Sequence, residues 1–208
     1  MEPGQKIEGD ADKWQRLLQY PTKELWLWDL QLCFAGEHGR RIQYEHVPNL
    51  AERYRDIIGR ISDKDGARNT LVLAIEQVLK ENSPVAVSSD TNKSSMLLDL
   101  VGDFTPPSGF DWIVQLMNDL GMPKSGTSRL TGKEDTHWQA LHALKSYFFL
   151  QPNFDDLSDT TKRPRMESAE RLSEYRQLLK KYSESLTDYA DYAKRVLGKL
   201  DVAFPPVI

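Results

Sequence analysis

Histidine is the residue type best suited to binding a metal or transferring a proton, and two histidines lie close together in this sequence. His137 and His142 are five positions apart. On a helix they would point in directions about 140° apart, so they could not share one metal ion. The run Asp63-Lys64-Asp65-Gly66 has the first acidic ligands of a calcium loop but lacks the later ones. We therefore predict no metal site, and we interpret the acidic run as a turn between helices.

Covalent catalysis would require an activated nucleophile. Cys33 is the only cysteine, and it lies in the apolar stretch 25–34, where burial would raise the thiol pKa and suppress reactivity. A single cysteine also excludes an internal disulfide and fits a reducing cytoplasm. Ser125-Gly126-Thr127 follows Lys124 but lacks the Gly-Lys-Ser/Thr order of a phosphate-binding loop. A buried thiol and a solvated loop are the expected structures.

Pairs of carboxylates can act as general acid and base when burial separates their pKa values. The pairs Glu134/Asp135 and Asp155/Asp156 instead lie in polar segments. We therefore predict no catalytic residue, no cofactor and no enzymatic activity.

Basic residues form three groups in the C-terminal part of the chain. Acidic residues such as Glu174 and Asp188 are interleaved with them, and the net charge is -4. We expect a solvated helix surface, and nucleic acid is an unlikely partner. The three groups are Lys162/Arg163/Arg165, Lys180/Lys181 and Lys194/Arg195/Lys199.

The composition is that of a folded protein. Of the 208 residues, 39% are hydrophobic and 28% are charged, which suffices for one domain with a sizeable core. Residues 1–10 are expected to be a flexible tail. No stretch resembles a signal peptide or a membrane span, so we expect a cytoplasmic protein that does not enter a membrane.

Apolar residues at helical spacing predict an all-α fold, because strand-like alternation is almost absent. We expect about seven or eight helices, arranged as a helical bundle or as stacked αα-hairpins. Pro21 separates two short N-terminal helices, and Thr22 is a candidate N-cap of the second. The helical segments that follow are predicted over 48–61, 67–80, 96–101, 110–120 and 137–150.

Two parts of this series are similar to each other. At an offset of 43 residues, Gly59 aligns with Gly102 and Gly66 with Gly109, and several apolar residues also coincide. This similarity suggests that one helix-turn-helix unit occurs twice.

The C-terminal part has the most regular apolar pattern. We predict a core domain over 11–150, a linker over 151–165, one long heptad helix over 166–200 and a tail over 201–208. Because tyrosine hydroxyls need partners or water, we expect a partly wet apolar seam that binds a partner or packs within the chain. The candidate partner-binding residues are Leu172, Tyr175, Leu179, Tyr182, Leu186 and Tyr189.

A family resemblance is carried by the middle of the chain. Residues 55–68 include the turn Asp63-Lys64-Asp65-Gly66-Ala67-Arg68, and residues 97–114 include the turn Pro107-Ser108-Gly109. Over about residues 50–122 the chain resembles an effector-associated domain of bacterial conflict and antiphage systems. The resemblance implies a death-fold-like helical adaptor without catalytic residues, which pairs homotypically to bring effectors to a sensor.

These features together predict a non-catalytic adaptor or scaffold that holds partner proteins, and the family resemblance implies that it links an effector to a sensor in bacterial defence or stress signalling. One alternative is a regulatory subunit or an effector substrate that is released by cleavage within 151–165. A second is a nucleic-acid-associated helical bundle that uses the C-terminal basic groups, and a third is an enzyme with an unfamiliar helical active site.

Overall fold

The predicted all-α class is confirmed by the computed structural model, which describes residues 14–35, 50–123, 133–149 and 169–205. Within these residues there are ten helices and no strand. The expected linker over 151–165 and the tail over 1–10 lie outside them, whereas the first residues of the expected tail over 201–208 belong to a helix that ends at Ala203. After a helix over residues 14–19, the elements are α2 (Lys23–Ala35), α3 (Leu50–Arg60), α4 (Lys64–Glu81), α5 (Pro84–Val87), α6 (Thr91–Phe104), α7 (Gly109–Leu120), α8 (Lys133–Phe149), α9 (Ala169–Ser183) and α10 (Ala190–Ala203).

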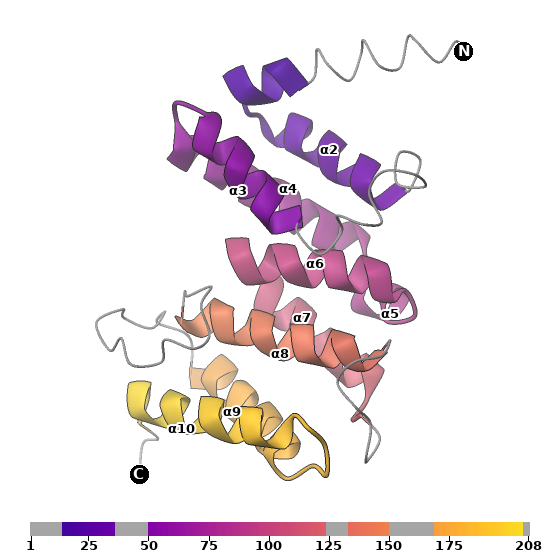
Figure 1. Cartoon of the computed structure of the whole chain (residues 1–208), viewed down its shortest axis with the longest axis vertical. Helices are drawn as coiled ribbons and strands as arrows, with labels where there is room; N and C mark the ends of the chain where they lie inside the picture. The colour runs from indigo at the N-terminus through magenta and orange to yellow at the C-terminus, as the bar shows by residue number, and fades with distance from the viewer. Residues whose placement is uncertain (1–13, 36–49, 124–132, 150–168, 206–208) are drawn as a thin grey trace.

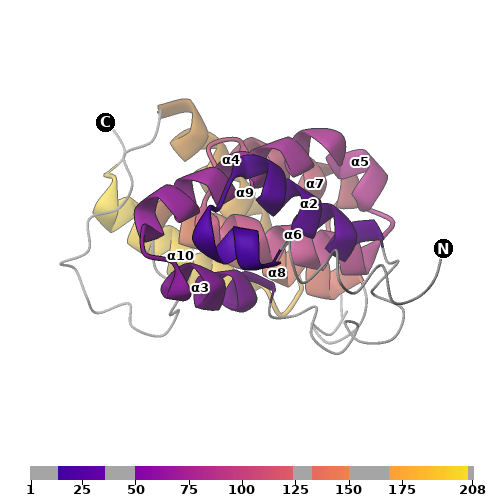
Figure 2. The ribbon, with the colours of Figure 1, turned by 90° about the horizontal axis from the view of Figure 1, so that it is seen from above.

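The helices are stacked in layers that follow the order of the sequence. The described N-terminal helices lie at one end of the stack, and α9 and α10 lie at the other (Figure 1). Seen along the stack, the layers overlap one another (Figure 2). α2 packs on α4, α3 on α6, and both α6 and α7 on α8. One continuous hydrophobic core extends through these layers from Leu17 to Leu200.

The apolar pattern explains why these helices pack as layers. In α3, Leu50, Tyr54 and Ile57 are buried on one side of the helix, as the sequence pattern predicts. α4 begins at a side-chain cap, since Asp63 accepts a hydrogen bond from the amide of Gly66 at 2.9 Å. The acidic run, predicted as a turn between helices, is the N-cap and the first turn of α4. None of the described helices has the length and apolarity needed to cross a bilayer.

The helix-turn-helix unit expected from the 43-residue offset occurs twice. α3 and α4 form one copy, α6 and α7 form the other, and α5 lies between them. Gly66 and Gly109 both lie at a helix start, where an added Cβ would crowd a neighbouring side chain. A Cβ at Gly66 would lie 2.2 Å from Asp63 Oδ2, and one at Gly109 would lie 2.6 Å from Val101 Cγ1. Residues 50–122 share their core with α2 and α8 and are the middle of the stack.

The prediction of one long helix over 166–200 is wrong. Its described part forms α9 and α10, which pack against each other as a helical hairpin. In the turn between them, the Ser185 hydroxyl donates to the Tyr182 carbonyl at 2.6 Å and lies 2.6 Å from the Thr187 hydroxyl. These bonds offer the backbone an alternative to the helix. Arg176 of α9 also pairs with Asp201 of α10 at 2.9 Å.

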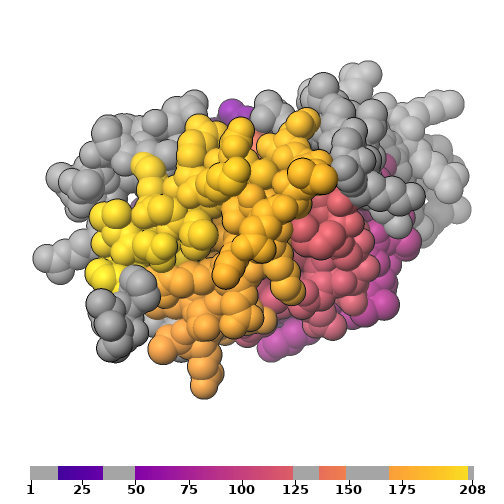
Figure 3. Space-filling model, turned by 90° about the horizontal axis from the view of Figure 1, so that it is seen from below, coloured from indigo at the N-terminus to yellow at the C-terminus, as the bar shows by residue number. Residues whose placement is uncertain are grey.

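The α9–α10 hairpin covers the end of the stack, where it occupies a large part of the face seen from below (Figure 3). Its contacts with α8 are made mainly by aromatic rings. Phe148 stacks on Tyr175 with ring centroids 4.6 Å apart, and His142 stacks on Tyr192 at 5.3 Å. Large rings between two helix layers keep the backbones apart while still excluding water.

Candidate functional site

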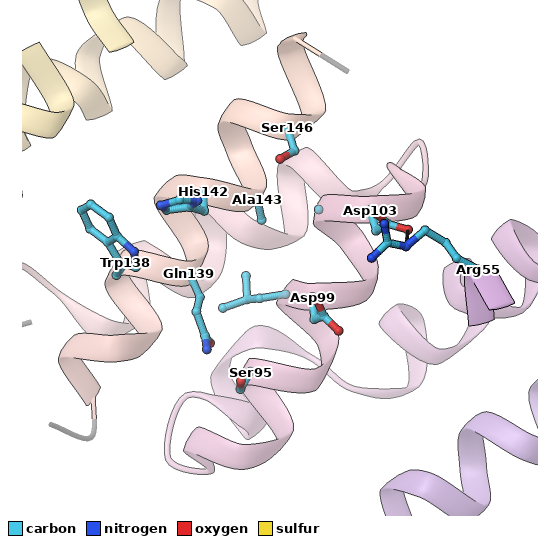
Figure 4. Close-up of a pocket in the computed structure, with 11 residues that line it drawn as sticks. Arg55, Ser95, Asp99, Asp103, Trp138, Gln139, His142, Ala143 and Ser146 are labelled. Atoms are coloured by element: carbon cyan, nitrogen blue, oxygen red, sulfur yellow. Dashed lines mark ion pairs between the residues drawn. The ribbon is translucent and has the colours of Figure 1, made fainter. Parts of the chain in front are cut away.

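A pocket opens on the side of the stack between α6 and α8, with one side chain contributed by α3. Its volume is about 350 Å³, and it is partly open to solvent. Arg55 reaches it from α3, Ser95 and Asp99 lie on α6, and Gln139 and Ser146 lie on α8 (Figure 4). A pocket of this size is within the range of ligand-binding cavities.

The two main walls are helices that approach each other closely. Gly102 of α6 faces Ala143 of α8, and a Cβ added to Gly102 would lie only 3.3 Å from the Cα of Ala143. Both residues line the pocket together with Leu98. Small residues let the backbones approach, so the pocket has a narrow apolar floor between two rows of polar side chains.

Asp99 connects the pocket to α3. Its Oδ2 accepts a hydrogen bond from the backbone amide of Ala51 at 2.9 Å, so it binds an amide of the first turn of α3 from a neighbouring helix. The pKa of Asp99 is raised to about 6, because burial and the nearby Asp103 raise it by more than the Ala51 amide and Arg55 lower it. Asp99 is therefore a carboxylate that has lost part of its hydration.

Asp103 and Arg55 form an ion pair at the α3 side of the pocket, with 3.3 Å between Arg55 Nε and Asp103 Oδ2. Burial raises the pKa of Asp103, while Arg55 and Arg68 lower it. The Arg68 guanidinium also donates to the backbone carbonyl of Asp103 at 3.1 Å. Oδ2 of Asp103 is buried, and it receives no hydrogen bond from the described residues because the Arg55 contact has ion-pair geometry only.

The α8 wall carries Trp138, Gln139 and His142. Trp138 and His142 also contact Tyr192 of α10, at ring-centroid distances of 4.7 Å and 5.3 Å, so the C-terminal hairpin fixes this wall from behind. The Gln139 side chain extends toward the α6 side, where Ser95 and Asp99 lie (Figure 4). Its Oε1 is buried and accepts no hydrogen bond from the part of the chain that the structure describes.

The pocket has the chemistry of a binding site for a polar group. It offers carboxylate, amide and hydroxyl groups, an aromatic wall and a guanidinium that is already paired. Among the described residues, Gln139 Oε1 accepts no hydrogen bond, and Asp103 Oδ2 has an ion-pair contact with Arg55 but no hydrogen bond. Within the part of the chain that the structure describes, no group of three or more metal-type ligands comes together.

Most of the residues that were expected to form a partner-binding seam do not lie on the surface of the protein. Tyr175, Leu179, Tyr182 and Tyr189 are each at most 1% exposed and belong to the chain's own core. Leu172 is half-buried against that core. Leu186, expected on the same seam, lies in the turn and is 81% exposed. The assignment of the four buried residues to a partner is therefore corrected, because the hairpin packs them within the chain's own core.

Cys33 lies in a polar cluster between α2 and α3. It is half-buried, and burial raises its pKa, with Asp29 raising it further. Its Sγ is 3.7 Å from Arg53 Nη1 and 4.0 Å from Tyr54 Oη. The sequence predicts the raised pKa but not the cluster, because Asp29 and Arg53 are separated in the chain and match no motif.

The other sequence candidates lie apart from the pocket or outside the description. Ser125–Thr127 and Asp155/Asp156 are outside the described residues, as are the side chains of Glu134 and Asp135. Lys180 and Lys181 are exposed, and Lys194 approaches Asp191 at 3.7 Å.

Sequence reasoning did not find the pocket. Its residues come from three helices, and the only signal was weak: Ser95, Asp99, Gly102 and Asp103 place polar and small residues on one side of an otherwise apolar helix. Comparisons of the chain with protein-family models, with curated proteins and with solved structures found no match.

Proposed function

We propose that the chain is a non-catalytic adaptor that binds a partner protein on the side of its helical stack, with the pocket between α6 and α8 as the recognition point. The observation that carries the proposal is a partly open pocket with two buried acceptor oxygens that receive no hydrogen bond from the described residues. Buried polar groups usually have partners, so these oxygens favour a bound group.

The surrounding architecture supports this role. The pocket lies between helices of the middle layers, and the α9–α10 hairpin supports its α8 wall through Tyr192. A binding site on rigid elements requires little ordering when a partner binds. The resemblance of residues 50–122 to effector-associated domains favours the same class of function, since those modules act by pairing with other proteins.

The proposal is tested by filling the pocket. Ser95→Trp places a large ring on the α6 wall, and Gln115→Trp places the same ring on an exposed position of α7 as the matched control. Each form is crosslinked in the native host, purified by affinity, and its attached chains are identified. We expect wild type and Gln115→Trp to retain the same partner and Ser95→Trp to lose it while melting as wild type does. A partner set that is unchanged in Ser95→Trp contradicts the proposal.

A further inference from the structure

The unsatisfied oxygens of the pocket define what it can bind. Gln139 Oε1 and Asp103 Oδ2 are both buried acceptors that receive no hydrogen bond from the described residues, although Asp103 Oδ2 lies 3.3 Å from Arg55 Nε in an ion pair. They come from opposite walls, on α8 and α6. An occupant that hydrogen-bonds to these oxygens must carry N–H or O–H donors, because a group that only accepts hydrogen bonds has nothing to donate to them.

The charged side chains of the pocket indicate whether its occupant should be an anion or a cation. Asp99 and Asp103 contribute two carboxylates, and Arg55 contributes one guanidinium that is paired with Asp103 at 3.3 Å. An anion would meet Asp99 without a free counter-charge. A cation would instead replace the hydration that the Asp99 carboxylate has lost.

The apolar part of the pocket suits the stem of such a cation. Leu98 and Ala143 line the floor, and Trp138 lies on the α8 wall. A methylene chain can pack on Leu98 and Ala143, and an aromatic ring attracts the cationic head. Lysine and arginine side chains combine an apolar stem with a cationic donor head.

We infer that the pocket binds an alkylammonium or alkylguanidinium group, delivered by a lysine or arginine side chain of a partner protein. This inference rests on the proposed adaptor function and names the chemistry of the partner. The head group donates to the Asp99 carboxylate and to the Gln139 amide oxygen. The competing occupant is water, which would satisfy the same oxygens without any charge preference.

Calorimetric titration of the full chain tests the inference with four probes. These are agmatine, acetyl-Ala-Arg-Ala-amide, acetyl-Ala-Lys-Ala-amide, and the matched peptide that carries the uncharged isostere citrulline. We expect the arginine peptide to bind at least about tenfold more tightly than the citrulline peptide, the ratio expected for a charge-assisted hydrogen bond. Equal binding of the two, or no binding of any probe, overturns the inference. If agmatine binds and neither the arginine peptide nor the lysine peptide does, the pocket is a site for a small molecule, and the inference that a partner protein delivers the cation is overturned.

Variants of the pocket locate the binding. Asp99→Asn keeps an acceptor for the Ala51 amide but removes the charge, so the arginine peptide should bind about tenfold more weakly. Gln139→Glu adds a charge at the other acceptor and should tighten binding roughly twofold to fivefold. Asp119→Asn makes the same charge change at an exposed position of α7 and should leave binding unchanged. Thermal melting confirms that each variant is folded. Equal affinity in Asp99→Asn and wild type overturns the assignment.

The outcomes separate this inference from the adaptor proposal. Peptide binding that is lost in Asp99→Asn, together with a partner set that Ser95→Trp leaves unchanged, supports the cation site and contradicts the adaptor role. Loss of the partner in Ser95→Trp without any probe binding supports the adaptor role and overturns the cation site.

Discussion

The hydroxyl of Tyr182 lies 2.6 Å from Nδ1 of His137, and this hydrogen bond joins α9 to α8 inside the aromatic layer. His137 is 3% exposed and Tyr182 is 1% exposed. Tyr189 also packs against both, with ring centroids 6.2 Å from His137 and 6.1 Å from Tyr182. A neutral imidazole can accept the Tyr182 proton, whereas an imidazolium in this layer would be a buried charge.

The stability of the fold should therefore depend on the protonation of His137. Burial lowers the pKa of His137 from 6.5 to about 4, so between these values the unfolded chain binds a proton that the folded chain does not. The contribution of His137 to the free energy of unfolding is therefore fully present above pH 6.5 and is lost as the pH decreases toward 4. We expect His137 to account for a loss of about 2 to 3 kcal/mol over this range. Urea denaturation at a series of pH values measures it.

The control for this prediction is His137→Gln, which is polar but does not titrate. Asp99 has the opposite effect, because its raised pKa favours the folded chain as the pH falls below about 6. Subtracting the His137→Gln curve from the wild-type curve cancels that contribution. Parallel curves between pH 7 and pH 4 would contradict the assignment to His137.

Two tyrosines of the same layer should respond differently to loss of the hydroxyl. The buried Tyr175 hydroxyl has no hydrogen-bond partner within the described residues, and the ring stacks on Phe148. Tyr175→Phe keeps the ring and removes an unsatisfied polar group, so it should leave the free energy of unfolding unchanged or raise it by up to about 1 kcal/mol. Tyr182→Phe should lower it by about 1 to 2 kcal/mol, because Nδ1 of His137 loses its partner. A larger loss in Tyr175→Phe than in Tyr182→Phe would contradict the structure.

Most helices of the stack can be predicted from the sequence because their apolar residues have one period and their ends carry ordinary signals. α4 illustrates this, since Asp63 caps its start and Asn82 follows its end. The C-terminal hairpin could not be predicted in the same way. Leu186 continues the apolar spacing of α9 but lies in the turn, where Ser185 and Thr187 bond locally. Apolar spacing alone cannot distinguish a continuous helix from two helices joined in phase.

The candidate site was less predictable than the fold. Asp99 appears in the sequence as a polar residue within an apolar helix, and its role depends on the amide of Ala51, which comes from α3. The narrow pocket floor likewise depends on Gly102 meeting Ala143. Contacts between separate helices leave no local signal in the sequence, so they can be found only in the three-dimensional structure.

The turn between α9 and α10 predicts a contrast between two leucines of the expected seam. Leu179 is 0% exposed and Leu186 is 81% exposed. Leu179→Asp buries a charge in the core and should prevent folding or cost more than about 3 kcal/mol. Leu186→Asp should change the free energy of unfolding by less than about 0.5 kcal/mol. Chemical denaturation measures both, and similar effects would support a continuous helix instead of the hairpin.

The cluster around Asp29 gives a final prediction about how α2 is held to α3. Asp29 is 4% exposed, and its carboxylate accepts from Tyr54 Oη at 2.9 Å and from Arg53 Nη2 at 3.2 Å. Arg53 also lies over the ring of Trp14, 4.8 Å from its centroid. Removing Asp29 would leave a guanidinium and a buried hydroxyl without this acceptor. Asp29→Ala should therefore cost about 3 kcal/mol.

A double variant shows whether the cost of Asp29→Ala comes from the loss of its pairing with Arg53. Replacing Asp29 and Arg53 together by alanine removes the uncompensated charge, so the double variant should be more stable than the sum of the two single changes predicts. Hydrogen exchange should show that α2 opens more readily in Asp29→Ala, because the carboxylate bonds to α3 from that helix. Asp119→Asn, at an exposed position on α7, serves as the silent control. Additive single changes, with unaltered exchange in α2, would show that the cluster does not hold the two helices together.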